Sequence, residues 1–538
     1  MTQWREPPVQ WIEGRWLKTT RQVSRGLLTS FSWTLTIEAQ NGESVVRHDF
    51  TVQPRSTFAA MLLVLFGRHQ LDRRINEAGE SLALWAKGVI DHPTPRPRVL
   101  PRQTQKALSD RAMLADGSEY GRGQVSRLVR WMSQAQSVDT ACIRPNILAA
   151  LWNADPDEVT EVLLAASTTG ILSKRWRLSC PSCAHSAVVT SNLSEIPESM
   201  TCPRCAAKLG KSLAREVEIV FVPNEDLRGF KPGRYAFDSP SAHPAVGARL
   251  RVQAKSRWST KWPPVKAPLQ AKVIDTGSAA TAAANSRGIS FAVAHGTISV
   301  ATNSEAKGTI ELVNHDDVDR GIALESGGSV ERGYSARRAL LLQAHHDIGG
   351  KELPSAGQRF LLDDVAVLAT DLAGLAARYQ RGGDAETFKA VSDLLRETTE
   401  IARDYGGSVA SRLGEIVIAV FPDTKKAFSA AMRLSAHGKS EGLPAFRGSI
   451  DIGNLAASAH KGRLVMKGPC IESAAAVLNK LAPGEIGLGN ETVGAPGMIK
   501  LIQGYRLIPM SDQGVDAQKL SLLVEAKTGG GDHSASAA

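Results

Sequence analysis

Four cysteines in two CxxC pairs form the most specific chemical pattern in this chain. Residues 180–183 read Cys-Pro-Ser-Cys and residues 202–205 read Cys-Pro-Arg-Cys, with eighteen residues between the pairs. Two tight turns that each present two thiolates can close tetrahedrally on one metal ion, and four sulfur ligands suit Zn²⁺. Such a site has no open position for water, so it would hold structure and perform no chemistry. The predicted zinc ligands are Cys180, Cys183, Cys202 and Cys205.

Two carboxylates near the C-terminus form a second pattern. A buried strand over residues 365–370 ends at Asp371, and strands over 409–413 and 416–421 are joined by a turn that contains Glu415. If these strands are neighbours, the two carboxylates can face one site, where a cation between them would relieve their repulsion. Carboxylate oxygens together with substrate phosphates suit Mg²⁺ or Mn²⁺, which could activate a hydroxyl group and hold a leaving phosphate.

The composition is that of an ordinary soluble protein. The 538 residues are 43% hydrophobic and 22% charged, which predicts roughly three to five domains. The longest apolar run, Phe58 to Phe66, is too short to span a bilayer, and the N-terminus has no apolar signal core. We therefore expect a cytoplasmic protein with no membrane partner, whose thiols stay reduced and can bind metal.

The net charge of +10 raises the question of nucleic-acid binding. The densest basic stretch, Arg251 to Lys266, contains Trp258 and Trp262, and aromatic side chains among cations can stack on single strands. A solvated strand face followed by a proline turn explains the same residues. Because no known nucleic-acid motif accompanies the stretch, nucleic acid is expected to be an unlikely partner.

Residues 1–90 read as strands followed by one long helix. Residues 31–37 alternate between apolar and polar side chains, Asn41-Gly42 predicts a hairpin turn, and residues 57–86 have helical periodicity. Strands that wrap a long helix resemble the helix-grip fold of START and polyketide-cyclase-like domains. Only the back half of that fold is represented, so we expect a partial domain.

Residues 91–179 begin with a proline-rich linker and continue as a helical module that looks like a winged helix. Its second helix carries Asp157, Glu158 and Glu161, where a DNA-recognition helix would need Arg, Asn or Gln. We therefore expect a packing module.

The rest of the chain divides at changes of composition. Within residues 206–335, short β-like runs with Gly and Asn between them predict a sandwich.

Adjacent His345 and His346 would point to different faces of a helix, so we expect a surface pair. The expected fold class is α+β and multidomain, with a zinc ribbon (180–205), a β-rich sandwich-like domain (206–335), a linker helix (336–358), the domain of the two carboxylates (359–510) and a C-terminal extension with a disordered tail (511–538).

The last third of the chain resembles the class III adenylate/guanylate cyclases. The resemblance lies in residues 365–374, VAVLATDLAG, and 406–421, GGSVASRLGEIVIAVF, and continues to Gly468. The upstream order of segments is similar to that of a group of bacterial cytoplasmic cyclases. The resemblance implies a ferredoxin-like βααββ core and a dimer with active sites at its interface. Such enzymes make cyclic AMP or cyclic GMP and pyrophosphate from the nucleoside triphosphate.

The catalytic positions that the resemblance implies are largely substituted. The first metal aspartate is Asp371, whereas the second is replaced by Glu415, and a displacement of about 1 Å can cost roughly a hundredfold in rate. Loss of the family's arginine can cost roughly 10³ or more. The purine-reading lysine and aspartate, the asparagine and the arginine fall at Ser411, Val465, Glu472 and Ala476, respectively.

Three hypotheses remain: two follow from these substitutions, and the third rests on the helical module and the basic stretch with Trp258 and Trp262. The first is a regulatory pseudo-cyclase in intracellular signal transduction, acting as a homodimer or heterodimer that can bind a nucleoside triphosphate. The second is an active adenylate/guanylate cyclase that uses Asp371, Glu415 and Mg²⁺ or Mn²⁺, with Lys461, Arg463 and Lys467 supplying the missing charge. The third is a nucleic-acid-binding regulator.

Overall fold

The computed structural model describes eighteen stretches of the chain that fall into two compact units. The upstream unit comprises Met1–Val189, Ser199–Lys211 and Arg215–Ser335, and the C-terminal unit comprises Thr190–Glu198, Ser212–Ala214 and Ala336–Ala538. The described residues are 3–5, 9–90, 99–180, 185–203, 208–210, 213–230, 246–261, 268–282, 288–301, 308–326, 333–349, 360–372, 384–440, 446–460, 463–478, 480–503, 505–509 and 520–525.

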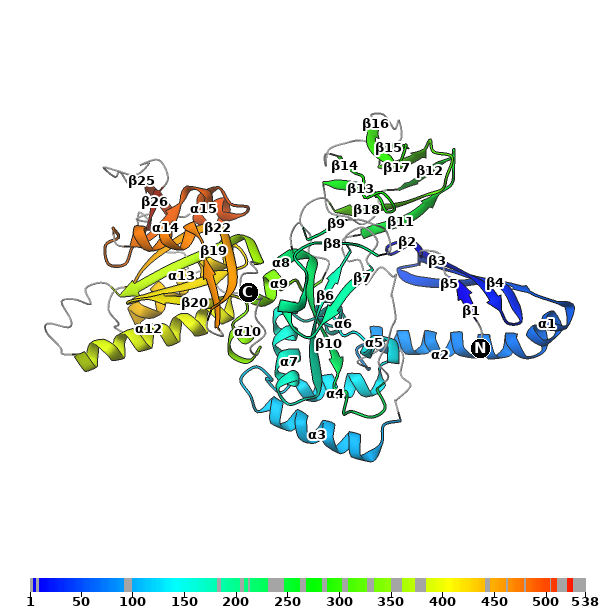
Figure 1. Ribbon diagram of the computed structural model, residues 1–538, viewed down its shortest axis with the longest axis horizontal. Helices are drawn as coiled ribbons and strands as arrows, with labels where there is room; N and C mark the ends of the chain where they lie inside the picture. Colours follow the sequence, from blue (N-terminus) through cyan, green and yellow to red (C-terminus); the bar gives the residue numbers. More distant parts are fainter. Residues whose placement is uncertain are drawn as a thin grey trace. The chain divides into compact units, whose positions relative to one another are not determined.

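The C-terminal unit is built on one mixed sheet (Figure 1). Its first four strands lie in the order β20-β21-β19-β22, and all three neighbouring pairs are antiparallel. This order is the ferredoxin-like topology that the sequence predicts. The first helix expected after β19 falls in residues 373–383, outside the described residues. The core elements are β19 (Phe360–Leu372), α12 (Asp384–Asp404), β20 (Ser408–Leu413), β21 (Ile416–Phe421), α13 (Thr424–Ser440) and β22 (Phe446–His460).

Helices cover both faces of β19. Alternate residues of the strand, including Ala366 and Leu368, join a buried cluster with side chains of α12 and α13. The other face contacts the helix α14 (Pro469–Leu478). A strand covered on both faces needs a near-continuous apolar run, which explains why Val365 to Ala369 are all fully buried. Beyond β22 the unit continues with β23 (Arg463–Lys467), β24 (Ile486–Gly489), α15 (Asn490–Gly494), α16 (Met498–Ile502), β25 (Tyr505–Pro509) and β26 (Leu520–Glu525).

Two short helices, α9 (Ala336–Leu340) and α10 (Gln343–Ile348), lie where one linker helix over 336–358 was expected, and residues 350–358 lie outside the described residues. The Arg337 guanidinium fastens α9 by donating to the carbonyls of Asp363, Asp364 and Pro422. The expectation of a surface histidine pair is wrong. His345 is 3% exposed, and His346 Nε2 lies 2.9 Å from the Leu340 carbonyl oxygen, because α10 packs against β20.

The upstream unit contains a β-sandwich. One layer is the sheet β12-β17-β15-β16, and the other is the run β14-β13-β18-β11, which continues through β2 into the N-terminal strands. Side chains of both layers form one buried cluster that includes Phe291, Leu312 and Leu324. The strands are β11 (Val246–Val252), β12 (Arg257–Lys261), β13 (Leu269–Val273), β14 (Ala279–Ala282), β15 (Ile289–Ala294), β16 (Thr297–Ala301), β17 (Thr309–Asn314) and β18 (Arg320–Ser326).

The helical module packs on a three-stranded sheet of order β10-β6-β7. The strand β10 follows the cysteine pairs in sequence, and it pairs with β6 along its whole length instead of joining the sandwich. The elements are α3 (Arg102–Asp116), α4 (Val125–Gln134), α5 (Ser137–Thr140), α6 (Pro145–Trp152), α7 (Pro156–Thr168), β6 (Leu172–Ser179), β7 (Ser186–Thr190), β8 (Met200–Thr201), β9 (Lys208–Leu209) and β10 (Val217–Pro223). Between them in sequence, η2 (Leu193–Glu195) and the first two residues of α8 (Leu213–Glu216) belong to the C-terminal unit.

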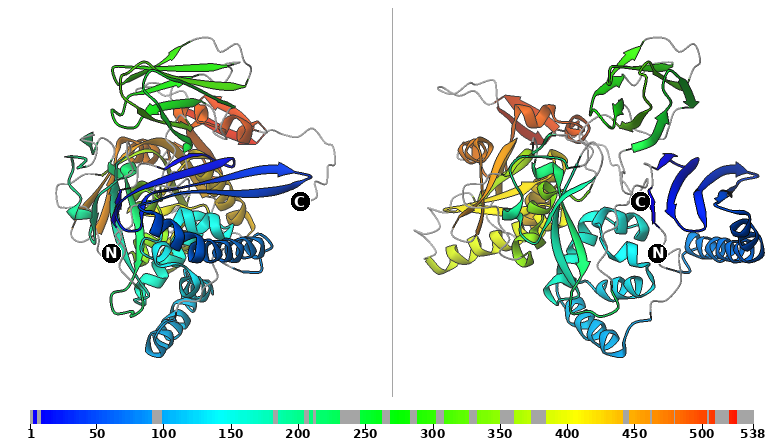
Figure 2. Two further views of the ribbon diagram at one scale, coloured as in Figure 1. Left: turned by 90° about the vertical axis from the view of Figure 1, so that its right-hand side faces the viewer. Right: turned by 45° about the vertical axis from the view of Figure 1, so that its right-hand side comes forward.

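The N-terminal segment is a curved antiparallel sheet followed by a long helical stretch (Figure 2, right). A π-helical turn interrupts the helix predicted over residues 57–86. Few of its side chains are buried, and Phe58, Val64 and Leu65 are more than half exposed. The elements are β1 (Gln3–Arg5), β2 (Gln10–Ile12), β3 (Trp16–Arg25), β4 (Leu28–Gln40), β5 (Glu43–Pro54), α1 (Thr57–Leu62), η1 (Leu63–Gly67) and α2 (Arg68–Ala86).

Candidate functional site

Asp371 lies near the end of β19, directly opposite Arg447 of β22. Opposed residues of an antiparallel pair project from the same face, so the two side chains meet. The Arg447 Nε donates to Asp371 Oδ1 at 2.8 Å, and Arg447 Nη2 donates to Asp371 Oδ2 at 2.6 Å. Both carboxylate oxygens of the candidate metal ligand therefore bind one guanidinium.

The pair is largely removed from solvent. The side chains of Asp371 and Arg447 are 9% and 18% exposed, and Arg447 Nη1 donates to the carbonyl of Leu481 at 3.0 Å. The hydrogen bonds to Asp371 raise the pKa of Arg447, while burial opposes this rise. A fork-to-fork pair of this kind is among the stronger charge-assisted contacts in proteins.

Glu415 lies in the hairpin turn between β20 and β21, after Gly414, whose φ of +62° suits a glycine. The register of β19 with β21 brings this turn to the same end of the sheet as Asp371. Glu415 is exposed, however, whereas Asp371 is buried against Arg447. In the described part of the chain, no three His, Cys, Asp or Glu side chains cluster in a way that could hold a metal ion. As they lie, the two carboxylates do not fit a two-cation site.

The substituted positions lie on β20, β23 and α14. Ser411 follows a bulge in the pairing of β20 with β21, and Val465 pairs with Ser458 of β22. Glu472 and Ala476 are both exposed, and their spacing of four residues places them on one face of α14. Within the described residues, α14 itself carries no basic side chain that could replace the missing arginine at that face. Lys467 is exposed on β23, and Lys461 lies outside the described residues.

Two of the four predicted zinc ligands can be located. Cys180 and Cys202 are 1% and 2% exposed. Cys180 directly follows β6, and its N–H donates to the His185 carbonyl just before β7, which is the neighbour of β6 in the sheet. Cys202 directly follows β8, which pairs with β9. Each cysteine therefore comes directly after a strand that pairs with the next strand along the chain. Cys183 and Cys205 lie outside the described residues.

The second helix of the expected winged helix, α7, is not a free recognition helix. Residues 159–166 of α7 are all buried, so no face of that stretch is available to enter a groove of DNA. Asp157 accepts a hydrogen bond from the hydroxyl of the buried Tyr334, and Glu161 pairs with Arg122. These two acidic side chains thus serve packing within the unit, whereas Glu158 is exposed.

Three cations of the basic stretch around Trp258 have acidic partners, whereas Lys261 is exposed and Lys266 lies outside the described residues. Arg251 pairs with Asp319 at 2.9 Å, Lys255 with Asp317 at 3.1 Å, and Arg257 with Glu311 at 3.2 Å. Trp258 packs against the sandwich core, and Trp262 lies outside the described residues. A surface whose cations are already paired attracts phosphates weakly.

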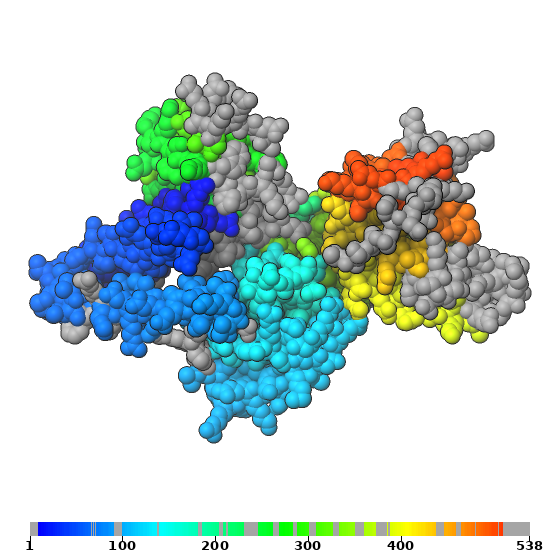
Figure 3. All heavy atoms as spheres, turned by 180° about the vertical axis from the view of Figure 1, so that it is seen from behind, coloured from blue at the N-terminus to red at the C-terminus, as the bar shows by residue number. Residues whose placement is uncertain are grey.

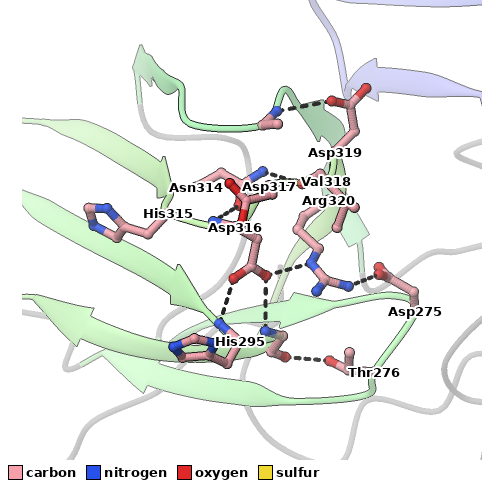
Figure 4. A network of polar contacts seen from close by, with 12 residues as sticks. Asp275, Thr276, His295, Asn314, His315, Asp316, Asp317, Val318, Asp319 and Arg320 are labelled. Carbon is pink, nitrogen blue, oxygen red and sulfur yellow. Dashed lines mark hydrogen bonds and ion pairs between the residues drawn. The ribbon is translucent and has the colours of Figure 1, made fainter.

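The loop between β17 and β18 supplies two of these acidic partners and is itself a structural network (Figure 4). Asp316 accepts hydrogen bonds from the backbone N–H groups of His295 and Gly296 and pairs with Arg320 at 2.7 Å. Arg320 also pairs with Asp275. Because these groups satisfy one another, the network explains the loop's shape without a ligand.

Solved structures that resemble this chain are cyclase domains. The guanylyl cyclase domain of the RhoGC fusion protein from the aquatic fungus Blastocladiella emersonii is 15% identical, with a TM-score of 0.27 over 31% of this chain and 97% of that one. The adenylyl cyclase CyaB from P. aeruginosa is 18% identical, with a TM-score of 0.28 over 32% and 98%. The adenylate/guanylate cyclase/hydrolase from Silicibacter pomeroyi is 18% identical, with a TM-score of 0.26 over 31% and 96%.

The chain matches no protein-family model and no curated protein. The ferredoxin-like fold of the C-terminal unit therefore rests on its own strand order. Among the described residues, no helix combines the length and the mean hydropathy needed to cross a bilayer.

Arg447 is the site residue that the sequence did not predict. Arg447 and Asp371 are 76 residues apart in the sequence. Only the pairing of β19 with β22 brings them together. A basic residue at the start of that strand was the one available signal.

Proposed function

We propose that the C-terminal unit is a regulatory, cyclase-like signalling domain that does not turn over nucleotide. The observation that carries this proposal is the capture of both Asp371 oxygens by Arg447. A divalent cation could bind Asp371 only by displacing a guanidinium that is already hydrogen-bonded and largely buried. Breaking such a pair leaves a charge uncompensated, which typically costs about 3–5 kcal/mol when the pair is fully buried.

The rest of the candidate site supports the same proposal. Cyclisation of a nucleoside triphosphate requires a deprotonated hydroxyl and a stabilised phosphate, and metal ions normally supply both. The carboxylate of Glu472 on α14 would instead face the developing phosphate charge, and Ala476 offers no compensating cation. Ser411 and Val465 have no charge with which to distinguish adenine from guanine.

A domain of this kind would act through its partners. We propose that it pairs with a second cyclase-like domain, in a homodimer or a heterodimer, and that the upstream unit relays a signal to that pair. One of the similar structures is described as a dimeric guanylyl cyclase domain and another as a monomeric one, so the fold is compatible with both states. A nucleoside triphosphate would bind weakly, as a ligand and not as a substrate.

The test has two parts, both on the full chain. Incubation with ATP or GTP and Mn²⁺ should yield no cyclic nucleotide, and robust turnover would establish the alternative of an active cyclase. The Arg447→Ala variant should gain a Mn²⁺ site, detected by titration calorimetry, because the Asp371 carboxylate becomes available. The gain should vanish in the Arg447→Ala/Asp371→Asn double variant.

The control is Arg506→Ala, which removes an exposed arginine of the same unit and should leave Mn²⁺ binding unchanged. If the alanine variant unfolds, Arg447→Gln replaces it, because the glutamine side chain removes the charge and can keep a hydrogen bond to Asp371. Tight Mn²⁺ binding by the wild-type chain that requires Asp371 would contradict the proposal.

We also propose that Cys180, Cys183, Cys202 and Cys205 bind one structural Zn²⁺. The support is their spacing and the burial of Cys180 and Cys202 directly after the strands β6 and β8. The purified chain should contain about one zinc ion, measured by plasma mass spectrometry, and Cys180→Ser should lower that content. Cys470→Ser, which removes a buried cysteine of the C-terminal unit, is the matched control.

A further inference from the structure

The outer edge of β5 carries no strand in the part of the chain that the structure describes. The N-terminal sheet ends at β5, whose twelve residues pair with β4 on one side. The surface of this segment is seen in Figure 3, where the strands and the helix form the blue part. An edge strand presents a row of backbone donors and acceptors that can pair with another strand.

The two faces of β5 differ sharply. Val46, His48, Phe50 and Val52 project from one face, where the His48 ring contacts both Trp33 and Phe50. This apolar face is poorly covered, since Val46 is 53% exposed. The opposite face carries Arg47 and Asp49, whose side chains are 3.3 Å apart and both exposed.

Arg47 and Asp49, two opposite charges at a spacing of two residues, favour the symmetric register that is centred between them. In a two-fold antiparallel pair, residue i faces j while j faces i, and facing side chains share a face. The centre of the register must therefore be a residue that faces itself. A register centred on Arg47 opposes like cations, and one centred on Asp49 opposes like anions. A register centred on Val45 would oppose Glu43 and Arg47, but it would pair only residues 43–47 of the strand. The register centred on His48 places Arg47 opposite the partner's Asp49 twice.

The register centred on His48 also brings apolar side chains of the two copies opposite each other. It places Val46 opposite the partner's Phe50 and pairs residues 43–53 over nearly the full strand. Each favourable cross-strand pair contributes roughly 0.2–1 kcal/mol, and like charges directly opposite cost similar amounts. Isolated charges on an edge strand usually prevent pairing. Here their signs and spacing make the edge complementary to itself.

We propose that β5 is a docking edge for a second copy of this chain, which extends the N-terminal sheet across a two-fold axis centred on His48. This interface is separate from any pairing of the C-terminal units. It leaves the apolar faces of two β4–β5 ribbons continuous with each other.

Disulfide trapping in the full chain tests the register. In the His48→Cys variant the two introduced thiols face each other, within the Cβ separation that a disulfide can close. Mild oxidation should cross-link most of the chain, at least tenfold more than in the wild type. Ser44→Cys is the control on the same face, because its two copies would lie eight residues apart, about 27 Å. Equal cross-linking of the two variants, or none of His48→Cys, would overturn the proposal.

A charge exchange in the His48→Cys chain makes the test specific. Arg47→Asp makes positions 47 and 49 both acidic, and Asp49→Arg makes both basic, so neither variant should cross-link with itself. A mixture of the two variants should cross-link as well as the parent, because each opposes the other with opposite charges. The double variant Arg47→Asp/Asp49→Arg should again cross-link with itself, because opposite charges face each other once more. Pairing through the C-terminal unit predicts no dependence on these charges, so charge-independent cross-linking would also overturn the proposal.

Discussion

The strands β19 and β4 are each thirteen residues long and each pair with a neighbour on both sides, yet their surroundings are opposite. In β19, residues 365–369 are fully buried between helices on two faces. In β4 no residue is fully buried, and Ile37 remains 36% exposed. The backbone ladder is thus equally regular in both regions, whereas the hydrophobic contribution to stability belongs mainly to β19.

The difference teaches that pairing and covering are separate requirements. Alternation of apolar and polar residues is sufficient for a long antiparallel ribbon to form, but a ribbon gains stability when another layer removes its apolar face from water. The helices α12, α13 and α14 do this for β19. Most side chains of α2 remain exposed or half-exposed, so the face of β4 is only half covered.

The largest expected effect compares one leucine in each strand. Leu368→Ala in β19 should lower the free energy of unfolding of its unit by about 2–5 kcal/mol, because it leaves a cavity in a closed core. Leu35→Ala in β4 should cost less, about 1–2 kcal/mol, because truncation of a half-buried side chain leaves no closed cavity. Hydrogen exchange of the backbone amides in each strand measures the two values separately.

Equal losses of unfolding free energy in Leu368→Ala and Leu35→Ala would contradict this prediction. Such a result would mean that the apolar face of β4 is covered in solution, as it would be if a further partner packs on it. Ala366→Gly is unsuitable as a control because it also changes the backbone entropy, so Leu361→Ala, at an exposed position of β19, is preferred.

The second prediction concerns an ion cluster that only a covered region can hold. Burial would raise the pKa of Glu218, but the charges of Arg177 and Arg144 and the hydrogen bonds from Arg177 and Ser179 outweigh it and lower the pKa to about 2. Because the folded pKa lies below the unfolded value, this group stabilises the fold above about pH 4.5. That contribution, on the order of 3 kcal/mol, should disappear as the pH falls from about 4.5 to about 2.

Acid unfolding followed by tryptophan fluorescence measures this dependence, since Trp176 of β6 lies opposite Ile219, next to Glu218. In Glu218→Gln the loss of stability between pH 4.5 and 2 should shrink, although the variant is less stable at neutral pH. Asp226→Asn is the control, because Asp226 pairs with Arg111 at an exposed position. An unchanged acid transition in Glu218→Gln would show that another group governs it.

The smallest expected effect tests whether the comparison extends to helix caps. The Ser56 hydroxyl accepts a hydrogen bond from Ala59 N–H at the start of the exposed helix α1, and the Asp155 carboxylate accepts one from Asp157 N–H at the start of the buried helix α7. Ser56→Ala and Asp155→Ala should each cost about 1 kcal/mol, because a cap acts locally. Amide exchange in the first turn of each helix gives both values, and a difference of severalfold would show that burial also controls capping.

Particular residues show how far the sequence could lead. The apolar run 365–370 predicted β19, and the turn at Gly414-Glu415 predicted the hairpin of β20 and β21. The hairpin turn at Asn41-Gly42 was also correct. The break between α9 and α10 was missed, because the apolar pattern of residues 336–348 continues through it. The joining of β2 to β11 was missed because it links residues more than 230 apart.

The sequence by itself determined the local elements and the residue types at the candidate site positions, because turn chemistry and apolar periodicity act over a few neighbouring residues. The tertiary structure alone decided what those residues meet. The contact of Asp371 with Arg447, the burial of His345 and the open edge of β5 all depend on strand order and on the layers that cover it. Such long-range pairings are set by the packing of the whole core, which no short stretch of sequence encodes.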